Sequence, residues 1–273
     1  MADAAQQPSQ IEGATRLPFA EQIAFFRAKL GNLIPTQVWD DLWKSQHDSG
    51  FMVAGATEAD LLADIAAAID QAISQGTSLE TFRKSFRQIV AQRGWTGWTG
   101  EGSAAGEAWR TRIIYTTNTS TAYAAGRLAQ LKAGGFPLWV YRHNDAVAHP
   151  RPQHLAWNGL TLPADHPFWQ THYPPNGWGC RCFCVGARHP AGAKRLGGEP
   201  DKTLPDGWDT PDPKTGELPG IDKGWGYQPG GTVDDTLTVL TKKLQSLPPQ
   251  LAKGLADDLA RGATGQVSAP PAP

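Results

Sequence analysis

The chain has 273 residues, a formal net charge of −1, 40% hydrophobic residues, 30 glycines and 22 prolines. This length and apolar content allow one large domain or two small ones with a hydrophobic core, while the glycines and prolines predict long connecting segments. A near-neutral chain has no global field that attracts DNA, so a DNA contact would need a local basic patch, and no apolar run reaches the roughly 18 residues of a membrane span.

The N-terminal part predicts a polar leader followed by a helical region. Residues 1–16 lack the charged and apolar segments of a signal peptide and are predicted to form a flexible leader. The helical region is predicted over residues 17–133, and Pro18 opens its first amphipathic helix. Thr36 is expected to cap a second, short helix. That helix would carry Val38, Trp39, Leu42 and Trp43.

Three longer helices are expected next, each with recognisable ends. Thr57 and Asp60 have the spacing of a capping box, and Gly76 ends the apolar stripe that follows them. Ser78 is predicted to cap the next helix. After a loop rich in glycine and tryptophan, a long helix is expected over about residues 105–132.

The pattern then changes from helical to extended. The β-branched and aromatic run LWVYRH predicts a strand, and short strands are expected at residues 159–162 and 181–185. These strands fall in a β-rich module predicted over residues 134–188. The chain is therefore expected to have an α+β fold, with a helical N-terminal region followed by a small β-rich module.

The C-terminal part predicts less regular structure. Residues 189–231 are rich in glycine, proline and aspartate and are predicted to form an arm or linker. Residues 232–262 are expected to form C-terminal helices, and residues 263–273 are expected to form a disordered tail.

The segment between His149 and Cys184 concentrates all three cysteines and four of the seven histidines of the chain. Cysteine and histidine are the usual ligands of a structural zinc ion. A disulfide between Cys180 and Cys182 is unfavourable at this spacing, so reduced thiols fit best, as in a cytoplasmic protein or a metal site. If residues 181–185 are extended, Cys180, Cys182 and Cys184 share one face of a strand.

Two blocks of this segment, HLAWNGLTLPADHPFW and THYPPNGWGCRC, are similar to the signature of the phage Mu F-like minor head proteins, the phage head morphogenesis family. The N-terminal runs FAEQIAFFRAKL, WDDLWKSQHDSGFMVAGA and ADLLADIAAAIDQAISQGTSLETFRKSF resemble the helical region of that family. The resemblance extends from about residue 18 to residue 185. It implies a minor capsid protein of a tailed phage or prophage that acts near the portal in head assembly and DNA packaging.

His154 and His172 both fall in the matching blocks and are the expected partners of the thiols, with His149 and His166 as alternates. His154 and His172 are therefore predicted to complete a tetrahedral zinc site with Cys180 and Cys182. The alternative is that the buried thiols pack as small hydrophobic groups while the histidines make hydrogen bonds in loops.

The resemblance also sets expectations for partners and location. The portal protein and the major capsid protein are the expected partners, packaged DNA is a further candidate, and neither a membrane nor a small-molecule substrate is expected. The protein is predicted to be assembled in the host cytoplasm and to end in the virion, inside the capsid or at the portal vertex.

No catalytic residues are predicted, because the sequence lacks a phosphate-binding loop, a nucleophile elbow and an H-E-x-x-H motif. One rival interpretation is a metal-dependent nuclease or toxin-like effector built on the His/Cys module. Another is a zinc-stapled DNA-binding module, which would need a contiguous basic face. The densest basic segment contains Arg110, Arg112, Arg127, Lys132, Arg142 and Arg151, and its alternative reading is a solvated helix face.

Large aromatic residues in the helical region are candidate anchors for an assembly partner. Trp39, Trp43 and Phe51 precede the helix that follows Thr57, and a short helix has little area to bury them. The alternative for each is a place in the hydrophobic core.

Overall fold

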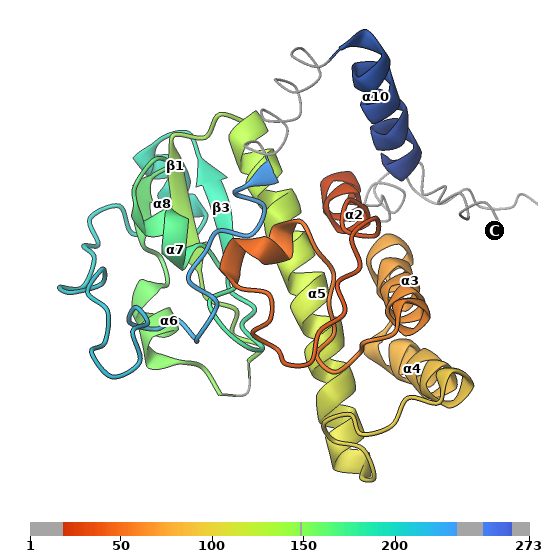
Figure 1. The fold of residues 1–273 in the computed structure, drawn as a ribbon. Coiled ribbons are helices and arrows are strands. Elements are labelled where there is room, and N and C mark those ends of the chain that lie inside the picture. Colours follow the sequence, from red (N-terminus) through yellow and green to blue (C-terminus); the bar gives the residue numbers. More distant parts are fainter. Residues whose placement is uncertain (1–18, 148, 234–247, 264–273) are drawn as a thin grey trace, which may run out of the picture.

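The computed structural model describes residues 19–147, 149–233 and 248–263 and shows the expected α+β fold (Figure 1). Helices gather on one side, a small sheet with short helices forms the other side, and the long helix α5 runs between them. None of the helices in these ranges combines the length and apolarity needed to cross a lipid bilayer. The elements in chain order are α2 (Ala20–Arg27), η1 (Lys44–Asp48), α3 (Ala59–Gln75), α4 (Leu79–Arg93), α5 (Ala104–Ala133), β1 (Leu138–Arg142), α6 (Pro152–Trp157), β2 (Thr161–Pro163), α7 (Phe168–His172), β3 (Phe183–Ala187), α8 (Pro190–Arg195) and α10 (Pro249–Ala263).

The three long helices confirm the predicted pattern, with one correction at an N-terminus. Ser78 caps α4 by accepting a hydrogen bond from the Thr81 N–H, and Gly76 ends α3 in the left-handed conformation at φ 69°. The capping box predicted at Thr57 is wrong. The N-cap of α3 is Glu58, and its side chain makes no capping hydrogen bond, so α3 is held by its buried apolar face.

The short helix predicted after Thr36 is also wrong. The carboxylate of Asp41 accepts hydrogen bonds from the N–H groups of Gln37 and Val38 at 2.7 and 3.0 Å, which holds this segment in a turn. The Thr36 hydroxyl donates to the Val53 carbonyl instead of capping a helix. A 3-10 helix, η1, follows the turn.

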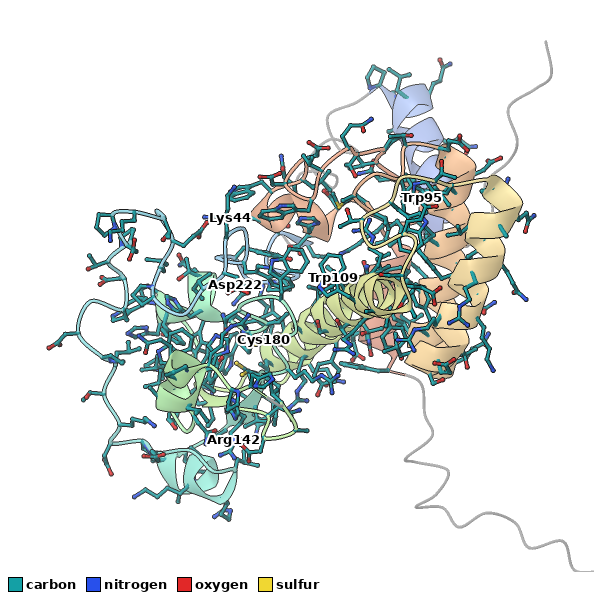
Figure 2. All side chains as sticks on the ribbon, turned by 90° about the horizontal axis from the view of Figure 1, so that it is seen from below. Lys44, Trp95, Trp109, Arg142, Cys180 and Asp222 are labelled. Carbon is teal, nitrogen blue, oxygen red and sulfur yellow. The ribbon has the colours of Figure 1, made fainter. Side chains whose placement is uncertain are left out.

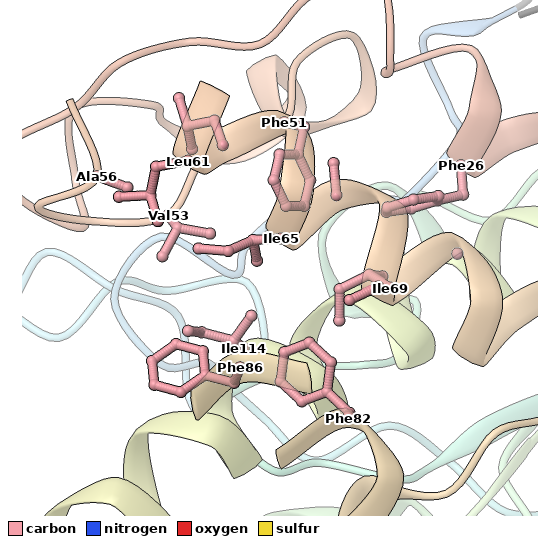
Figure 3. Close-up of a cluster of buried hydrophobic side chains, with 14 of the residues drawn as sticks. Phe26, Phe51, Val53, Ala56, Leu61, Ile65, Ile69, Phe82, Phe86 and Ile114 are labelled. Atoms are coloured by element: carbon pink, nitrogen blue, oxygen red, sulfur yellow. The ribbon is translucent and has the colours of Figure 1, made fainter. Parts of the chain in front are cut away.

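The helical side has its own hydrophobic core, formed by α2, α3, α4 and α5 together with the segment around residues 51–56 (Figure 3). Phe26 and Phe51 meet edge to face within it, with ring centroids 5.8 Å apart. Phe51 is therefore a core residue and is excluded as an anchor for a partner, whereas Trp39 is exposed and Trp43 is partly exposed.

Helices α2 and α5 pack closely at Gly126. A Cβ atom at this position would lie 2.6 Å from the backbone nitrogen of Gln22 and 2.9 Å from its Cα, so only glycine lets the two helices approach this far. Gly126 is thus needed for packing, although glycine lowers intrinsic helix propensity.

We expect Gly126→Ala to lower the free energy of unfolding by about 1–3 kcal/mol, because the clash with a backbone outweighs the gain of about 1 kcal/mol in helix propensity. Gly254→Ala in α10 is the matched control, since a Cβ there meets no atom within 4 Å. This second change should be neutral or stabilising. Chemical denaturation of both variants measures the difference, and equal stabilisation by both changes would contradict the account of the α2–α5 contact.

The sheet is antiparallel with strand order β2-β1-β3, so the predicted LWVYRH strand is its centre. Trp139 pairs with Leu162 on one side and with Gly186 on the other. The flanking strands begin two residues later than predicted, at Thr161 and Phe183. Cys180 and Cys182 therefore precede β3 in a loop and do not lie along one face of a strand.

The segment predicted to be an arm or linker lies against the module. After α8, Leu160 and Glu199 form a parallel bridge, and Ile221 and Trp225 are buried in the core of the module. The segment then reaches the helical side, where Gly230 donates its backbone N–H to the Asp48 carboxylate at 2.9 Å. The division of the chain into domains stays a prediction. Three predicted parts of the chain lie outside the described residues: the leader, residues 234–247, and residues 264–273 of the tail.

Candidate metal centre

Three of the four predicted zinc ligands come together inside the module. His154 lies on α6, and Cys180 and Cys182 lie in the loop before β3. The His154 Nδ1 atom is 3.6 Å from the Cys180 Sγ atom and 3.7 Å from the Cys182 Sγ atom. All three side chains are buried, and their potential ligand atoms lie within 4.8 Å of one another. Figure 2 shows Cys180 inside the module. This cluster could hold a metal ion.

The loop that carries the cysteines is fixed by Asp222, which is more than forty residues later in the chain. The Asp222 carboxylate accepts hydrogen bonds from the Arg151 guanidinium at 2.6 Å and from the Trp178 backbone N–H at 2.8 Å. A Cβ at Gly177 would lie 2.3 Å from the Asp222 Oδ2 atom, so glycine allows the carboxylate to approach the loop backbone. Asp222 therefore helps to place both thiols.

A backbone carbonyl from a distant part of the chain orients His154. Its Nε2 atom lies 2.8 Å from the carbonyl oxygen of Gly220. Because a carbonyl only accepts hydrogen bonds, Nε2 carries the proton and the Nδ1 lone pair faces the two thiols. The ring also stacks on Trp157, with centroids 5.3 Å apart. Gly220 has φ 75°, and a Cβ there would lie 2.4 Å from Trp157.

The two thiols are electrostatically unequal. A hydrogen bond from Cys182 lowers the pKa of Cys180 well below its usual range, although burial opposes the shift. The hydrogen bond to Cys180 and burial raise the pKa of Cys182. The pair therefore favours a single negative charge on Cys180 with the proton held on Cys182. Thiolate is the metal-binding form of cysteine, so a bound cation would displace this proton.

Tyr141 of β1 pairs with Cys184 of β3 and lies next to the loop that carries the two clustered cysteines. Its buried hydroxyl donates a hydrogen bond to the Asn176 side-chain oxygen at 2.8 Å. It also contacts the Cys182 side chain, an interaction that lowers the pKa of that thiol against the larger opposing effects. Residues behind the ligands commonly hold them in register for a metal ion.

His172 is buried next to the cluster but is not a member of it. Its ring stacks on Phe168 with centroids 4.5 Å apart and meets Trp157 edge to face at 5.1 Å. Burial lowers the pKa of His172 to about 4, so the ring is neutral at physiological pH. Its Nδ1 atom pairs with the Thr171 hydroxyl at 2.8 Å, while Nε2 has no hydrogen-bond partner among the described residues.

The third cysteine, Cys184, is separate from the cluster. It is fully buried in β3, and burial raises its pKa well above the usual range. The Cys184 carbonyl accepts a hydrogen bond from Arg127 at 3.4 Å. Cys184 therefore packs as a small hydrophobic residue. For this cysteine the alternative interpretation, in which a buried thiol serves only in packing, applies.

Much of the basic segment is engaged within the protein. The guanidinium of Arg110 donates to the Ala54 carbonyl, that of Arg142 donates to the Gly197 carbonyl, and that of Arg151 pairs with Asp222. Arg127 donates to the Cys184 carbonyl, so at least four of the six residues of this segment have partners within the described part of the chain.

Comparisons with known proteins show what this chain is similar to. The model for phage Mu protein F-like proteins matches residues 63–185, which include all three clustered side chains. The chain is 35% identical over 270 residues to a protein named capsid assembly protein F of Escherichia phage Mu, in an alignment covering 88% of this chain and 60% of that protein. It is 34% identical over 151 residues to the Mu-like prophage FluMu F protein of Haemophilus influenzae, covering 53% of this chain and 36% of that protein.

These alignments cover less than two thirds of the length of either relative. No solved structure matches the chain.

Proposed function

We propose that this chain is a minor capsid protein of a tailed phage or prophage that acts in head assembly, because the model for phage Mu protein F-like proteins matches residues 63–185. The observation that carries this proposal is the alignment with capsid assembly protein F of phage Mu, which runs over 270 residues and so extends beyond the family segment on both sides. The relevant site of action is the portal vertex or the inner face of the capsid. The expected partners are the portal protein and the major capsid protein.

The role of the His/Cys module in this proposal is structural. The module core is dense in aromatic rings, and Trp157 contacts His154, His172, Tyr141 and Phe168. The clustered ligand atoms are buried, as in structural zinc sites, and the cluster includes no carboxylate that could serve as a general base. We propose no catalytic residue and no small-molecule substrate.

A zinc ion suits the soft donor set of two thiols and one imidazole. His154, Cys180 and Cys182 would hold it, and His172 is the proposed fourth ligand because its buried Nε2 has no partner among the described residues. When bound, the ion would cross-link α6 to the loop before β3 and so add its binding free energy to folding.

Head formation in cells tests the proposed function. Deleting the gene from its phage or prophage should abolish DNA-filled heads, and supplying the intact gene from a plasmid should restore them. Electron microscopy of the lysates, with counts of filled and empty heads, provides the readout. Normal numbers of filled heads after deletion would contradict the proposal.

The enzymatic alternative is tested separately on the purified protein. We expect no cleavage of single- or double-stranded DNA with Mg²⁺, Mn²⁺ or Zn²⁺, because the cluster found among the described residues includes no carboxylate that could act as a general base. DNA cleavage that disappears in a folded His154→Ala variant would instead support the nuclease interpretation.

Tyr141→Phe should weaken zinc binding by about 10–100-fold, because the lost hydroxyl contacts a ligand thiol. The free energy of unfolding should fall by only about 1–2 kcal/mol. Tyr173→Phe is the matched control, since the buried Tyr173 hydroxyl donates to the Ala124 carbonyl at 3.1 Å and not to a ligand. Competition with a chromophoric chelator measures both affinities, and equal affinities in the two variants would contradict the positioning role of Tyr141.

A further inference from the structure

A cavity of about 910 Å³ lies between part of the helical side and the His/Cys module. Its walls come from residues 37–55, from residues 96–99 with the first half of α5, and from the segment that follows Asp222. In Figure 2, Trp109 lies on α5 near the middle of the molecule. A cavity of this size matches the range of ligand-binding pockets.

Tryptophan is the dominant side chain of this cavity. Six of the eleven tryptophans of the chain line it: Trp39, Trp43, Trp98, Trp109, Trp178 and Trp225. Trp109 is 49% exposed, Trp39 is 37% exposed and Trp178 is 36% exposed, so these rings retain apolar surface that folding has not removed from water. Exposed tryptophans grouped around one cavity are typical of binding anchors.

Some of these tryptophan rings already contact one another across the cavity's two sides. Trp39 meets Trp178 edge to face at 5.7 Å between ring centroids, and Trp178 meets Trp225 in the same way at 5.2 Å. Because these contacts fix the rings before a ligand arrives, binding would cost little side-chain entropy.

The charged residues that line the cavity are all cations. They are Lys29, Arg110 and Lys223, and no aspartate or glutamate is among the lining residues, although Asp40, outside the lining, pairs with Lys223 at 3.1 Å. Lys223 holds its ammonium group 5.2 Å from the Trp39 ring centroid and 5.5 Å from that of Trp43. The lining therefore favours a ligand that combines apolar side chains with negative charge.

The accessibility of these cations selects between two kinds of anionic ligand. Lys29 and Arg110 are buried, whereas the Lys223 side chain is 60% exposed. A nucleic-acid strand needs a row of accessible cations along its phosphates, which this lining does not provide. A peptide needs a single cation for one carboxylate and flat aromatic surfaces for its apolar side chains.

We propose that this tryptophan-lined cavity docks an extended acidic segment of another head protein, with a carboxylate near Lys223 and apolar side chains against Trp39, Trp109 and Trp178. The proposal rests on the proposed function for the identity of the partner. It places the binding surface at the junction of the helical side and the module.

Peptide arrays test the proposal. Overlapping peptides of 12 residues would tile the head proteins encoded by the same phage or prophage, and the intact purified chain would be applied to them. We expect binding to acidic peptides with apolar side chains, followed by measurement of the dissociation constant of the tightest peptide by fluorescence anisotropy. Trp109→Ala and Lys223→Glu should each weaken that peptide by about tenfold or more, which corresponds to 1.4 kcal/mol.

Matched controls exist on α8 and the residue after it. Lys194→Glu reverses the charge of an exposed lysine that, like Lys223, pairs with an aspartate, and Leu196→Ala truncates an exposed apolar side chain. Both controls should bind the peptide with unchanged affinity. A single-stranded dT20 oligonucleotide serves as the competing probe.

The outcomes separate this proposal from the proposed function. An array without binding peptides, or binding that Trp109→Ala and Lys223→Glu leave unchanged, would overturn the docking site. Binding of dT20 that both variants abolish would assign the cavity to nucleic acid and also overturn it. If head formation still depends on the gene in either case, the proposed function stands without this docking site.

Discussion

Replacing both Cys180 and Cys182 with serine should remove bound zinc and lower the free energy of unfolding by on the order of 5 kcal/mol or more. The reason is that a structural metal ion contributes its binding free energy directly to folding. The ion would join α6 to the loop before β3. Without it, the N-cap of α6, Arg151, reaches this loop through hydrogen bonds to the Trp178 carbonyl and to Asp222. Elemental analysis of the dialysed protein and thermal unfolding with and without a chelator measure the two effects.

Cys184→Ala is the matched control for this change. Cys184 is buried in the same core but is not a member of the cluster, so its removal should leave the zinc content at one ion per chain. The chelator experiment on the unchanged protein covers the case in which the double variant does not fold. Zinc-free protein that melts at the same temperature with and without chelator would favour the alternative, in which the thiols only pack as small hydrophobic groups.

Trp157→Ala should be the most damaging single truncation in the module, at about 3–5 kcal/mol. Trp157 is fully buried, and its ring contacts both His154 and His172, so its loss creates a large cavity and frees the two imidazoles. The variant should therefore also lose zinc. Trp178→Ala, which truncates a 36% exposed ring, should cost about 1 kcal/mol or less. Chemical denaturation compares the two, and similar losses would contradict the central role of Trp157.

The long helices were predictable because their signals are local. The apolar stripe of α3, the Ser78 cap and Gly76 all lie within or next to the helices that they specify. The turn at Thr36 was missed because Asp41 competes for the same backbone N–H groups that a helix start would offer. A short segment of this kind is decided by one side-chain hydrogen bond, which residue preferences do not reveal.

The candidate site was predictable only in part for the same reason. The crowding of cysteine and histidine pointed to His154, Cys180 and Cys182, and the structure places these three together. The sequence did not indicate that Gly220 and Asp222, far along a glycine- and proline-rich segment, would orient the histidine and hold the loop. Such long-range backbone contacts leave no periodic pattern. The separation of His172 from the cluster likewise depends on how the Phe168 and Trp157 rings pack around it.

The most direct test of the proposed role is the protein content of purified heads. Empty and DNA-filled heads from the phage or prophage that encodes this chain would be separated on a density gradient and analysed by quantitative mass spectrometry. The proposed function predicts that peptides of this chain co-migrate with at least one head form, at a low and fixed ratio to the major capsid protein. Complete absence of the chain from every head form, in lysates where the free protein is abundant, would contradict it.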